Sequence, residues 1–322
     1  MAAGCAFQSP NDVLIREPGV RTYSPAQPVQ AQARRLVDYA VLSANVYFTD
    51  WGTEASKVKH PGQGPTGSAS DPAVMECENG DKPIDLKDWK RWDDFPSSAL
   101  RAEADTFGLY FEVWQNKSLN PPIVAMIFRG TQFDSWLDWQ ANLRWLVKWI
   151  PGWKDQYWVV RNQVRDKFRK ALLENRSKEG PAWRPVVVTT GHSLGGGLAQ
   201  QLAYSLLDDG EPSEVRGVSE VFAFDPSPVT GWYSVPEGQR IRNAKGLSIT
   251  RAFEHGEVLA YLRLLFSYAY PPSAQDPAIW EVRFNFNESW NPFSSHGMRA
   301  LACHLQGAAG TLATNRANAL KR

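Results

Sequence analysis

The sequence predicts an α/β fold, a central and mostly parallel β-sheet flanked by helices, and three consecutive features indicate it. Residues 186–188 are valines, a β-branched run typical of a buried strand. The turn Gly-His-Ser-Leu-Gly at residues 191–195 follows, and leucines at four-residue intervals from Leu194 to Leu206 then form a helical pattern. Strand, sharp turn and helix in this order are typical of the turn that presents a nucleophilic serine, here Ser193.

The two glycines that flank Ser193 have a steric explanation. Gly191 and Gly195 stand two residues before and two residues after the serine. A serine in such a turn occupies a strained backbone position, and a side chain on either neighbour would collide with the turn. The alternative interpretation is a glycine-rich turn with an incidental serine. The adjoining strand and helix patterns favour Ser193 as a nucleophile.

Composition limits the classes of partner. The 322 residues are 43% hydrophobic, enough to bury a sizeable core. Lys+Arg 35 against Asp+Glu 34 leaves no basic field, so nucleic acid is not expected as a partner. The cysteines, Cys5, Cys77 and Cys303, lack metal-ligand spacing and allow at most one disulfide. We therefore expect neither a metal nor a cofactor.

The chain divides into an arm and one domain. Residues 1–28 contain several prolines and no hydrophobic period, which predicts an extended N-terminal arm before a single domain at 29–322. Apolar residues at helical spacing over 36–44 predict a packing helix. Residues 51–95 are dense in Gly, Pro, Asp and Lys, which indicates an irregular insertion.

The start of the chain leaves the location open. Residues 2–5, Ala-Ala-Gly-Cys, end as the cleavage site of a bacterial lipoprotein does, but the apolar run before such a site is missing. Either the start is truncated and Cys5 anchors a cell-envelope lipoprotein, or the match is chance in a cytoplasmic or secreted protein. No apolar stretch has the length that spans a bilayer, so apart from a lipid on Cys5 we expect a soluble protein.

A second candidate catalytic segment follows an expected β-hairpin. Strand patterns at 109–114 and 123–128 predict the hairpin, and Gly130 and Thr131 come just after it. A glycine there lets the backbone turn close to the active site, so that Thr131 can direct its N–H and hydroxyl at a developing oxyanion. The second expected donor is the N–H of Leu194. The alternative is an ordinary strand end with a turn glycine.

Taken together, three motifs resemble the class 3 lipases, the fungal-type triacylglycerol lipase family. They are Phe-Arg-Gly-Thr at 128–131, Asp-Trp with Asn-Leu at 138–143, and Gly-His-Ser-Leu-Gly-Gly at 191–196. The resemblance covers residues 105–305. It implies an α/β-hydrolase fold, hydrolysis of lipid or other acyl esters without a metal, and a short helical lid just after the oxyanion residue.

The region where the resemblance places the lid is rich in tryptophan. Such side chains combine an apolar ring with a polar N–H, which suits transient contact with a membrane surface, although the rings could instead pack against the core. The helix that follows is basic, either as a solvated face or for attraction to anionic head groups. The tryptophans are Trp136, Trp139, Trp145, Trp149, Trp153 and Trp158, and the basic residues are Arg161, Arg165, Lys167, Arg169 and Lys170.

A serine hydrolase needs an acid and a base in the chain order serine, acid, histidine. His296 follows a strand expected at 279–284 and precedes a helix expected to begin near Met298. The Ser-His-Gly-Met run around it also resembles the histidine motif of the family, which implies that His296 is the base. His192 is set aside because it is fixed inside the serine turn.

Two carboxylates compete for the role of the acid. Glu257 follows a strand expected at 247–253, and Gly-Glu-Val at 256–258 stands where the family has Asn-Asp-x-Val. Asp225, in Phe-Asp-Pro-Ser-Pro at the end of the preceding strand, resembles the acid position of pancreatic-type lipases. The resemblance to class 3 lipases favours Glu257, and Asp225 stays open as the alternative.

The sequence thus predicts a serine ester hydrolase that acts on lipid esters, of lipase or phospholipase A type, through Ser193, His296 and an acid. The alternative is a catalytically silent lipase-fold protein that binds lipid or a partner. Lipase, phospholipase, esterase and thioesterase activities are not separated, because pocket shape sets acyl and head-group preference. Residues 258–266 are strongly apolar and could line an acyl pocket or form a core helix.

Overall fold

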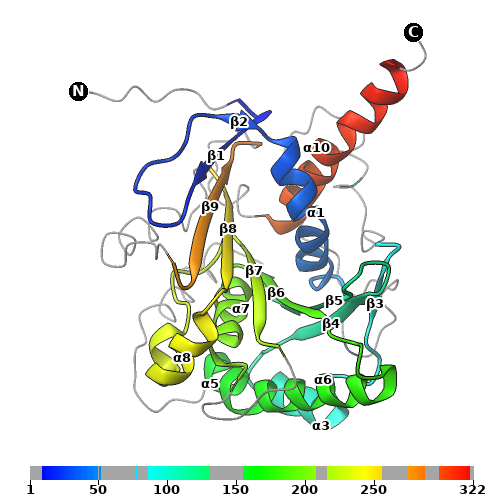
Figure 1. Cartoon of the computed structure of the whole chain (residues 1–322), viewed down its shortest axis with the longest axis vertical. Helices are drawn as coiled ribbons and strands as arrows, with labels where there is room; N and C mark the ends of the chain where they lie inside the picture. Colours follow the sequence, from blue (N-terminus) through cyan, green and yellow to red (C-terminus); the bar gives the residue numbers. More distant parts are fainter. Residues whose placement is uncertain are drawn as a thin grey trace.

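The computed structural model describes residues 9–49, 51, 77, 86–130, 155–207, 216–255, 275–286 and 297–319, with 311–319 as backbone alone. Within these ranges the strands form one nine-stranded sheet in the order β2-β1-β9-β8-β7-β6-β5-β4-β3 (Figure 1). Strands β5 to β9 run parallel, and antiparallel strands extend both edges. The strands are β1 Asp12–Arg16, β2 Gln27–Pro28, β3 Trp89–Arg91, β4 Phe111–Asn116, β5 Ile123–Phe128, β6 Val186–His192, β7 Val218–Phe224, β8 Ser248–Glu254 and β9 Ala278–Phe284.

Helices cover both faces of the sheet. In Figure 1, α1 and α10 lie together on one side, and α3, α6, α7 and α8 lie on the other. The described helices are α1 Gln30–Asn45, α3 Ser98–Asp105, α5 Gln156–Val159, η1 Val160–Val164, α6 Arg165–Glu179, α7 Leu194–Ser205, η2 Trp232–Ser234, α8 Glu237–Ala244 and α10 Met298–Ala319. The α/β class and the mostly parallel sheet predicted from the sequence are confirmed.

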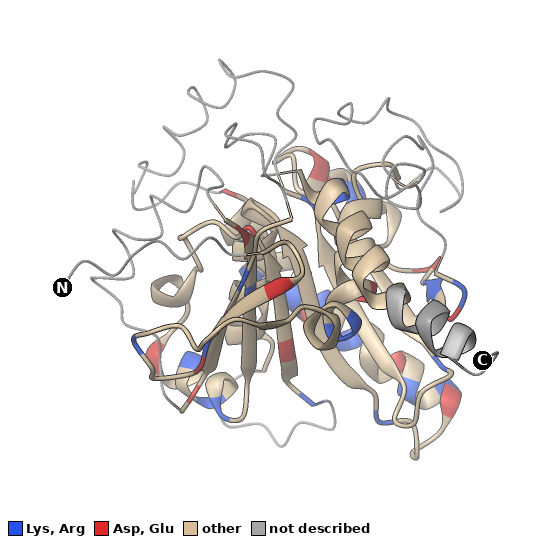
Figure 2. Cartoon of the chain, turned by 90° about the horizontal axis from the view of Figure 1, so that it is seen from above, with Lys and Arg blue, Asp and Glu red and all other residues tan. Residues whose placement is uncertain are grey.

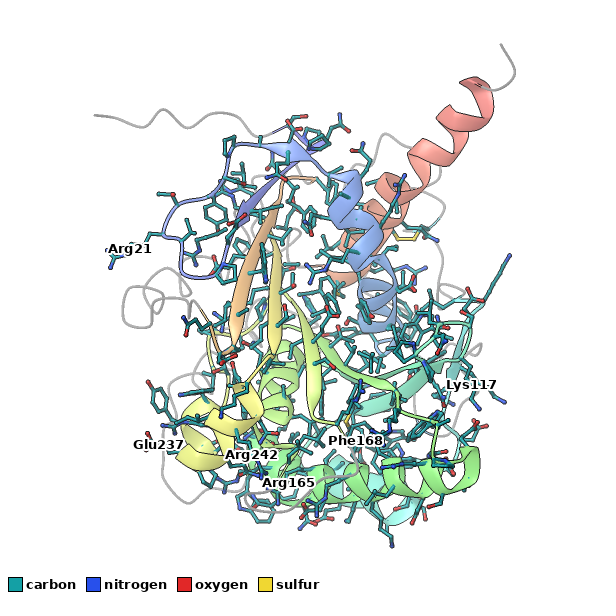
Figure 3. All side chains as sticks on the ribbon, in the orientation of Figure 1. Arg21, Lys117, Arg165, Phe168, Glu237 and Arg242 are labelled. Carbon is teal, nitrogen blue, oxygen red and sulfur yellow. A yellow bond between two sulfur atoms is a disulfide. The ribbon has the colours of Figure 1, made fainter. Side chains whose placement is uncertain are left out.

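Strand alternation divides the core into two layers. Val187 belongs to the cluster that packs against α6 and α7, and its neighbour Val188 belongs to the cluster under α1 and α10. Phe168 of α6, labelled in Figure 3, is fully buried in the first of these clusters. Because successive side chains of a strand point to opposite faces, a strand covered on both sides is apolar throughout. This explains the unbroken valine run of β6.

Two segments differ from the sequence expectation. The arm expected at residues 1–28 contributes β1 and β2, and β1 joins the sheet by antiparallel pairing of Leu14 with Arg283 of β9. Val13 and Ile15 alternate into the core, a two-residue pattern too short to stand out among the prolines. The described part of the insertion expected at 51–95 includes β3, which pairs with β4.

Other elements agree closely with their patterns. The hairpin expected at 109–114 and 123–128 is confirmed as β4 and β5, which pair along their whole length from Phe111 opposite Phe128 to Asn116 opposite Ile123. The packing helix expected at 36–44 lies within α1. Strands β8 and β9 and the start of α10 also fall within one residue of the expected bounds.

A disulfide joins Cys77 to Cys303 of α10, and it is drawn as a yellow bond in Figure 3. The guanidinium of Arg299 donates to the carbonyl oxygen of Cys77 at 3.0 and 2.8 Å, so residue 77 is held to α10 by two kinds of bond. Cys5 lies outside the described residues. In the described part of the chain, no helix is long and apolar enough to cross a membrane.

A buried carboxylate anchors the antiparallel edge. Glu112 of β4 accepts hydrogen bonds from Thr49 at 2.8 Å, Tyr110 at 2.6 Å and Trp114 at 2.7 Å, and pairs with Arg91 of β3 at 3.0 Å. A buried charge is tolerated when donors surround it in this way. The cluster therefore ties the loop after α1 to strands β3 and β4.

Glu112→Gln is expected to lower the free energy of unfolding by about 2–4 kcal/mol, because the amide leaves Arg91 without its charge partner and presents N–H groups to donors. Urea unfolding measures this change. Glu220→Gln is the control, since Glu220 pairs with Arg35 at an exposed site where such pairs contribute about 0–1 kcal/mol. Equal effects of the two substitutions would contradict a structural role for the buried cluster.

Candidate active site

Ser193 occupies the strained turn that the sequence predicts. It lies between the end of β6 and the first residue of α7, with φ 57° and ψ −123°. A positive φ is unfavourable for a residue with a Cβ and costs about 1–3 kcal/mol, so the surrounding structure must hold it. Strain of this kind is typical of functional positions. Ser193 is buried but not fully, with 6% of its surface exposed.

Backbone hydrogen bonds hold this turn from both sides. The N–H of Ser193 donates to the carbonyl oxygen of Phe224, the last residue of β7, at 2.9 Å. The carbonyl oxygen of Ser193 accepts from the N–H groups of Gly196 at 3.0 Å and of Ser227 at 2.9 Å. The serine is thereby fixed to α7 and to the loop after β7.

The glycines around Ser193 are required by close backbone contacts. A Cβ on Gly195 would lie 2.3 Å from the carbonyl oxygen of Phe128, and one on Gly191 would lie 2.6 Å from Gly195. A Cβ on Gly130 would lie 3.2 Å from the Cβ of Ser193. The predicted steric role of the flanking glycines is confirmed, as is the close approach of Gly130 to the serine.

Asp225 lies beside the serine turn at the end of β7. It is fully buried and is one of two described non-glycine residues with a positive φ, 40°, the other being Ser193. Its Oδ1 accepts from the N–H of Glu254 at 3.1 Å, and its Oδ2 lies 4.0 Å from Nε2 of His192. Because β6 and β7 are parallel neighbours, their carboxyl ends bring Ser193 and Asp225 to the same edge of the sheet.

A tyrosine that follows α1 completes this edge, and no sequence pattern indicated it. The Tyr47 hydroxyl lies 2.9 Å from Nδ1 of His192 and accepts from the N–H of Gly130 at 3.1 Å. Burial raises the pKa of Tyr47 above its ordinary value, while the Gly130 amide and Arg129 act in the opposite direction. Tyr47 is therefore an uncharged hydroxyl at neutral pH. His192, set aside from the sequence, has a buried side chain in contact with it.

Several predicted site residues lie outside the described ranges. They are Thr131, Glu257, His296, residues 258–266 and the tryptophans at 136–153. Trp158 is described, and its partly buried ring packs against the core. No group of three or more His, Cys, Asp or Glu in the described part of the chain is placed to hold a metal ion.

The basic residues after the tryptophan-rich segment form surface ion pairs. Arg165 pairs with Asp166 at 2.9 Å and Lys167 with Glu103 of α3 at 3.2 Å. Figure 2 shows basic and acidic residues interspersed over the described elements. This arrangement favours the solvated-face interpretation for these two residues over a basic surface for anionic lipid.

Comparison with known families bears on the central part of the chain. Residues 125–232 match the model described as Lipase (class 3). The match covers less than half of the chain. The matched segment begins in β5 and ends at the first residue of η2, so it contains Gly130, Ser193 and Asp225. A serine turn between a parallel strand and its following helix is typical of the α/β-hydrolase fold.

Solved structures of fungal proteins are distantly similar to the chain. It is 15% identical to the native Rhizomucor miehei lipase propeptide complex, over 90% of this chain and 81% of that one, with a TM-score of 0.43. It is 18% identical to a mutant form of MDLA from Penicillium cyclopium, over 73% of this chain and 75% of that one, with a TM-score of 0.40. No match was found among curated protein sequences.

Proposed function

We propose that this class 3 lipase-type ester hydrolase acts on lipid esters through Ser193, His296 and Asp225, by way of an acyl-enzyme. The family supports lipase-type ester hydrolysis, and the catalytic residues are our proposal. The observation that carries it is the backbone of Ser193, held at φ 57° between β6 and α7. Such a turn directs the hydroxyl away from the sheet, where a substrate carbonyl can reach it.

His296 is the proposed base. In the sequence it lies after the end of β9 and two residues before Met298, where α10 begins. The α/β-hydrolases have their histidine after the last strand of the sheet, and we propose that His296 takes the proton of the Ser193 hydroxyl as the serine attacks the ester carbon. The imidazolium then gives the proton to the leaving alcohol, and water attacks the acyl-enzyme in a second cycle.

For the acid we propose Asp225, because its described geometry suits the role; the family resemblance in the sequence favours Glu257, which lies outside the described residues. Asp225 is fully buried, and its neighbour Phe224 is hydrogen-bonded to Ser193. A buried carboxylate at the strand end beside the nucleophile suits an acid that orients a histidine and stabilises its cation. Its positive φ is backbone strain of the kind found at functional residues.

Thr131 and Leu194 are the proposed donors to the oxyanion. Leu194 is the first residue of α7, so its N–H lies at the positive end of the helix, where negative charge is stabilised. Thr131 follows Gly130, whose backbone lies against Ser193. Two donors at these positions would bind the tetrahedral intermediate more strongly than the ground-state carbonyl, which lowers the barrier.

Hydrolysis of p-nitrophenyl esters of increasing acyl length, repeated with phospholipid vesicles, tests the proposed function. We expect turnover of soluble esters and release of fatty acid from dispersed lipid. Turnover of short esters alone would identify an esterase, and release from phospholipid would identify a phospholipase. A folded protein that hydrolyses none of them would support the silent lipase-fold alternative and contradict the proposal.

A further inference from the structure

The end of α1 is anchored beneath the active-site edge of the sheet. The hydroxyl of Ser43 lies 2.9 Å from that of Thr190 on β6, and both residues are fully buried. The N–H of Tyr47 donates to the carbonyl oxygen of Ala44 at 3.2 Å, which continues the chain for one more turn. These bonds fix the backbone from which the Tyr47 side chain reaches the serine turn.

The Tyr47 hydroxyl contacts Gly130, which follows β5, and His192, which lies in the serine turn. A Cβ on Gly130 would lie 2.7 Å from the Tyr47 hydroxyl oxygen, so the contact is possible because residue 130 has no side chain. The rings of Tyr47 and His192 meet edge to face, with centroids 5.8 Å apart. Gly130 lies against Ser193, and His192 directly precedes Ser193 in the chain. Tyr47 therefore contacts two segments that both adjoin the serine.

The Gly130 N–H fixes the direction of one hydrogen bond in this group, and the His192 tautomer sets the direction of the other. The Gly130 N–H can only donate, so the oxygen of Tyr47 accepts there. The hydroxyl proton of Tyr47 can be donated to Nδ1 of His192 in the neutral tautomer that carries its ring proton on Nε2. The ring proton of that tautomer lies on Nε2, the atom that faces Oδ2 of Asp225 at 4.0 Å. The Tyr47 hydroxyl thus links the His192 ring to the Gly130 N–H through two hydrogen bonds.

We propose that Tyr47 is a positioning residue. Together with His192, it holds the peptide between Arg129 and Gly130 in one orientation, and this orientation in turn positions the proposed oxyanion donor Thr131. This inference rests on the proposed ester hydrolysis. Pre-oriented donors stabilise a transition state because they need no reorganisation during the reaction, so loosening the Gly130 peptide should affect the tetrahedral state more than substrate binding.

Tyr47→Phe tests the role, because it keeps the ring and removes the hydroxyl. Loss of a direct oxyanion donor lowers kcat by about 10²–10³, and we expect an indirect loss of about tenfold, with KM changed by less than about twofold. The Ki of an alkyl boronic acid, which forms a tetrahedral adduct with serine, should rise by the same factor as kcat/KM falls. If Tyr47 served only to pack the core, the substitution would lower the melting temperature without lowering kcat or raising the Ki of the boronic acid.

Tyr39→Phe is the matched control, since Tyr39 lies on α1 and its ring stacks on Phe222 at 4.0 Å, a contact that phenylalanine retains. It should leave kcat and the boronic acid Ki unchanged. His192→Phe tests the same role from the other side, because it removes the Nδ1 atom that contacts the Tyr47 hydroxyl and leaves Tyr47 in place. If the two residues act as one unit, Tyr47→Phe combined with His192→Phe should lower kcat no further than the more severe single change.

The outcomes separate this inference from the proposed function. An active wild type with an unchanged kcat and Ki in Tyr47→Phe would overturn the positioning role alone. Fully multiplicative effects of the two substitutions would also overturn it, because independent sites behave in that way. A folded wild type that neither hydrolyses esters nor binds the boronic acid would overturn the proposed function and this inference with it.

Discussion

Ser193→Ala is expected to reduce kcat for ester hydrolysis by a factor of about 10⁴ or more and to abolish covalent labelling by an alkyl phosphonate probe. Without the hydroxyl there is no acyl-enzyme, and only substrate binding and the oxyanion donors remain. Alanine carries the same Cβ as serine at φ 57°, so the backbone strain is unchanged and the melting temperature should move little. Turnover, labelling and thermal unfolding measure the three effects.

Ser205→Ala serves as the control for this prediction. Ser205 is also buried, at the other end of α7, where its hydroxyl donates to the carbonyl oxygen of Gln201 at 2.9 Å. The variant should keep both turnover and labelling. Retained labelling of the Ser193→Ala protein would show that another residue is the nucleophile, and the whole assignment would then be wrong.

Asp225→Asn is expected to reduce kcat by about 10⁴ and to leave the protein folded. The amide keeps an oxygen that can accept from the N–H of Glu254, but it lacks the charge that stabilises the imidazolium and can leave the histidine in the wrong tautomer. The steady-state kcat and the melting temperature should be measured together. Loss of a purely structural carboxylate would lower the melting temperature and leave kcat unchanged.

Glu257→Gln completes this experiment and is expected to keep most of the activity. The resemblance to class 3 lipases favours Glu257 as the acid, whereas the burial and strand-end position of Asp225 favour the arrangement of the pancreatic-type lipases. If Glu257→Gln abolishes turnover and folded Asp225→Asn remains active, the acid lies at residue 257. Asp225 would then hold Glu254 and His192 in place.

Features encoded over short stretches of chain were predictable. The serine turn depends on Gly191 and Gly195, where a Cβ would meet backbone atoms of the turn and of Phe128, so the local pattern identifies it. The β4–β5 hairpin and α7 follow in the same way from apolar spacing within one element. The serine turn and the glycine after β5 were therefore available from the sequence.

Contacts between distant segments were decided by the tertiary structure alone. The pairing of β1 with β9, the bond between Cys77 and Cys303 and the approach of Tyr47 to Gly130 each join residues that no local pattern relates. The support for Asp225 as the proposed acid likewise depends on its burial at the edge where β6 and β7 end together. Periodicity reports which face of an element is apolar, but the partner of that face is fixed only when the folded chain brings the two elements together.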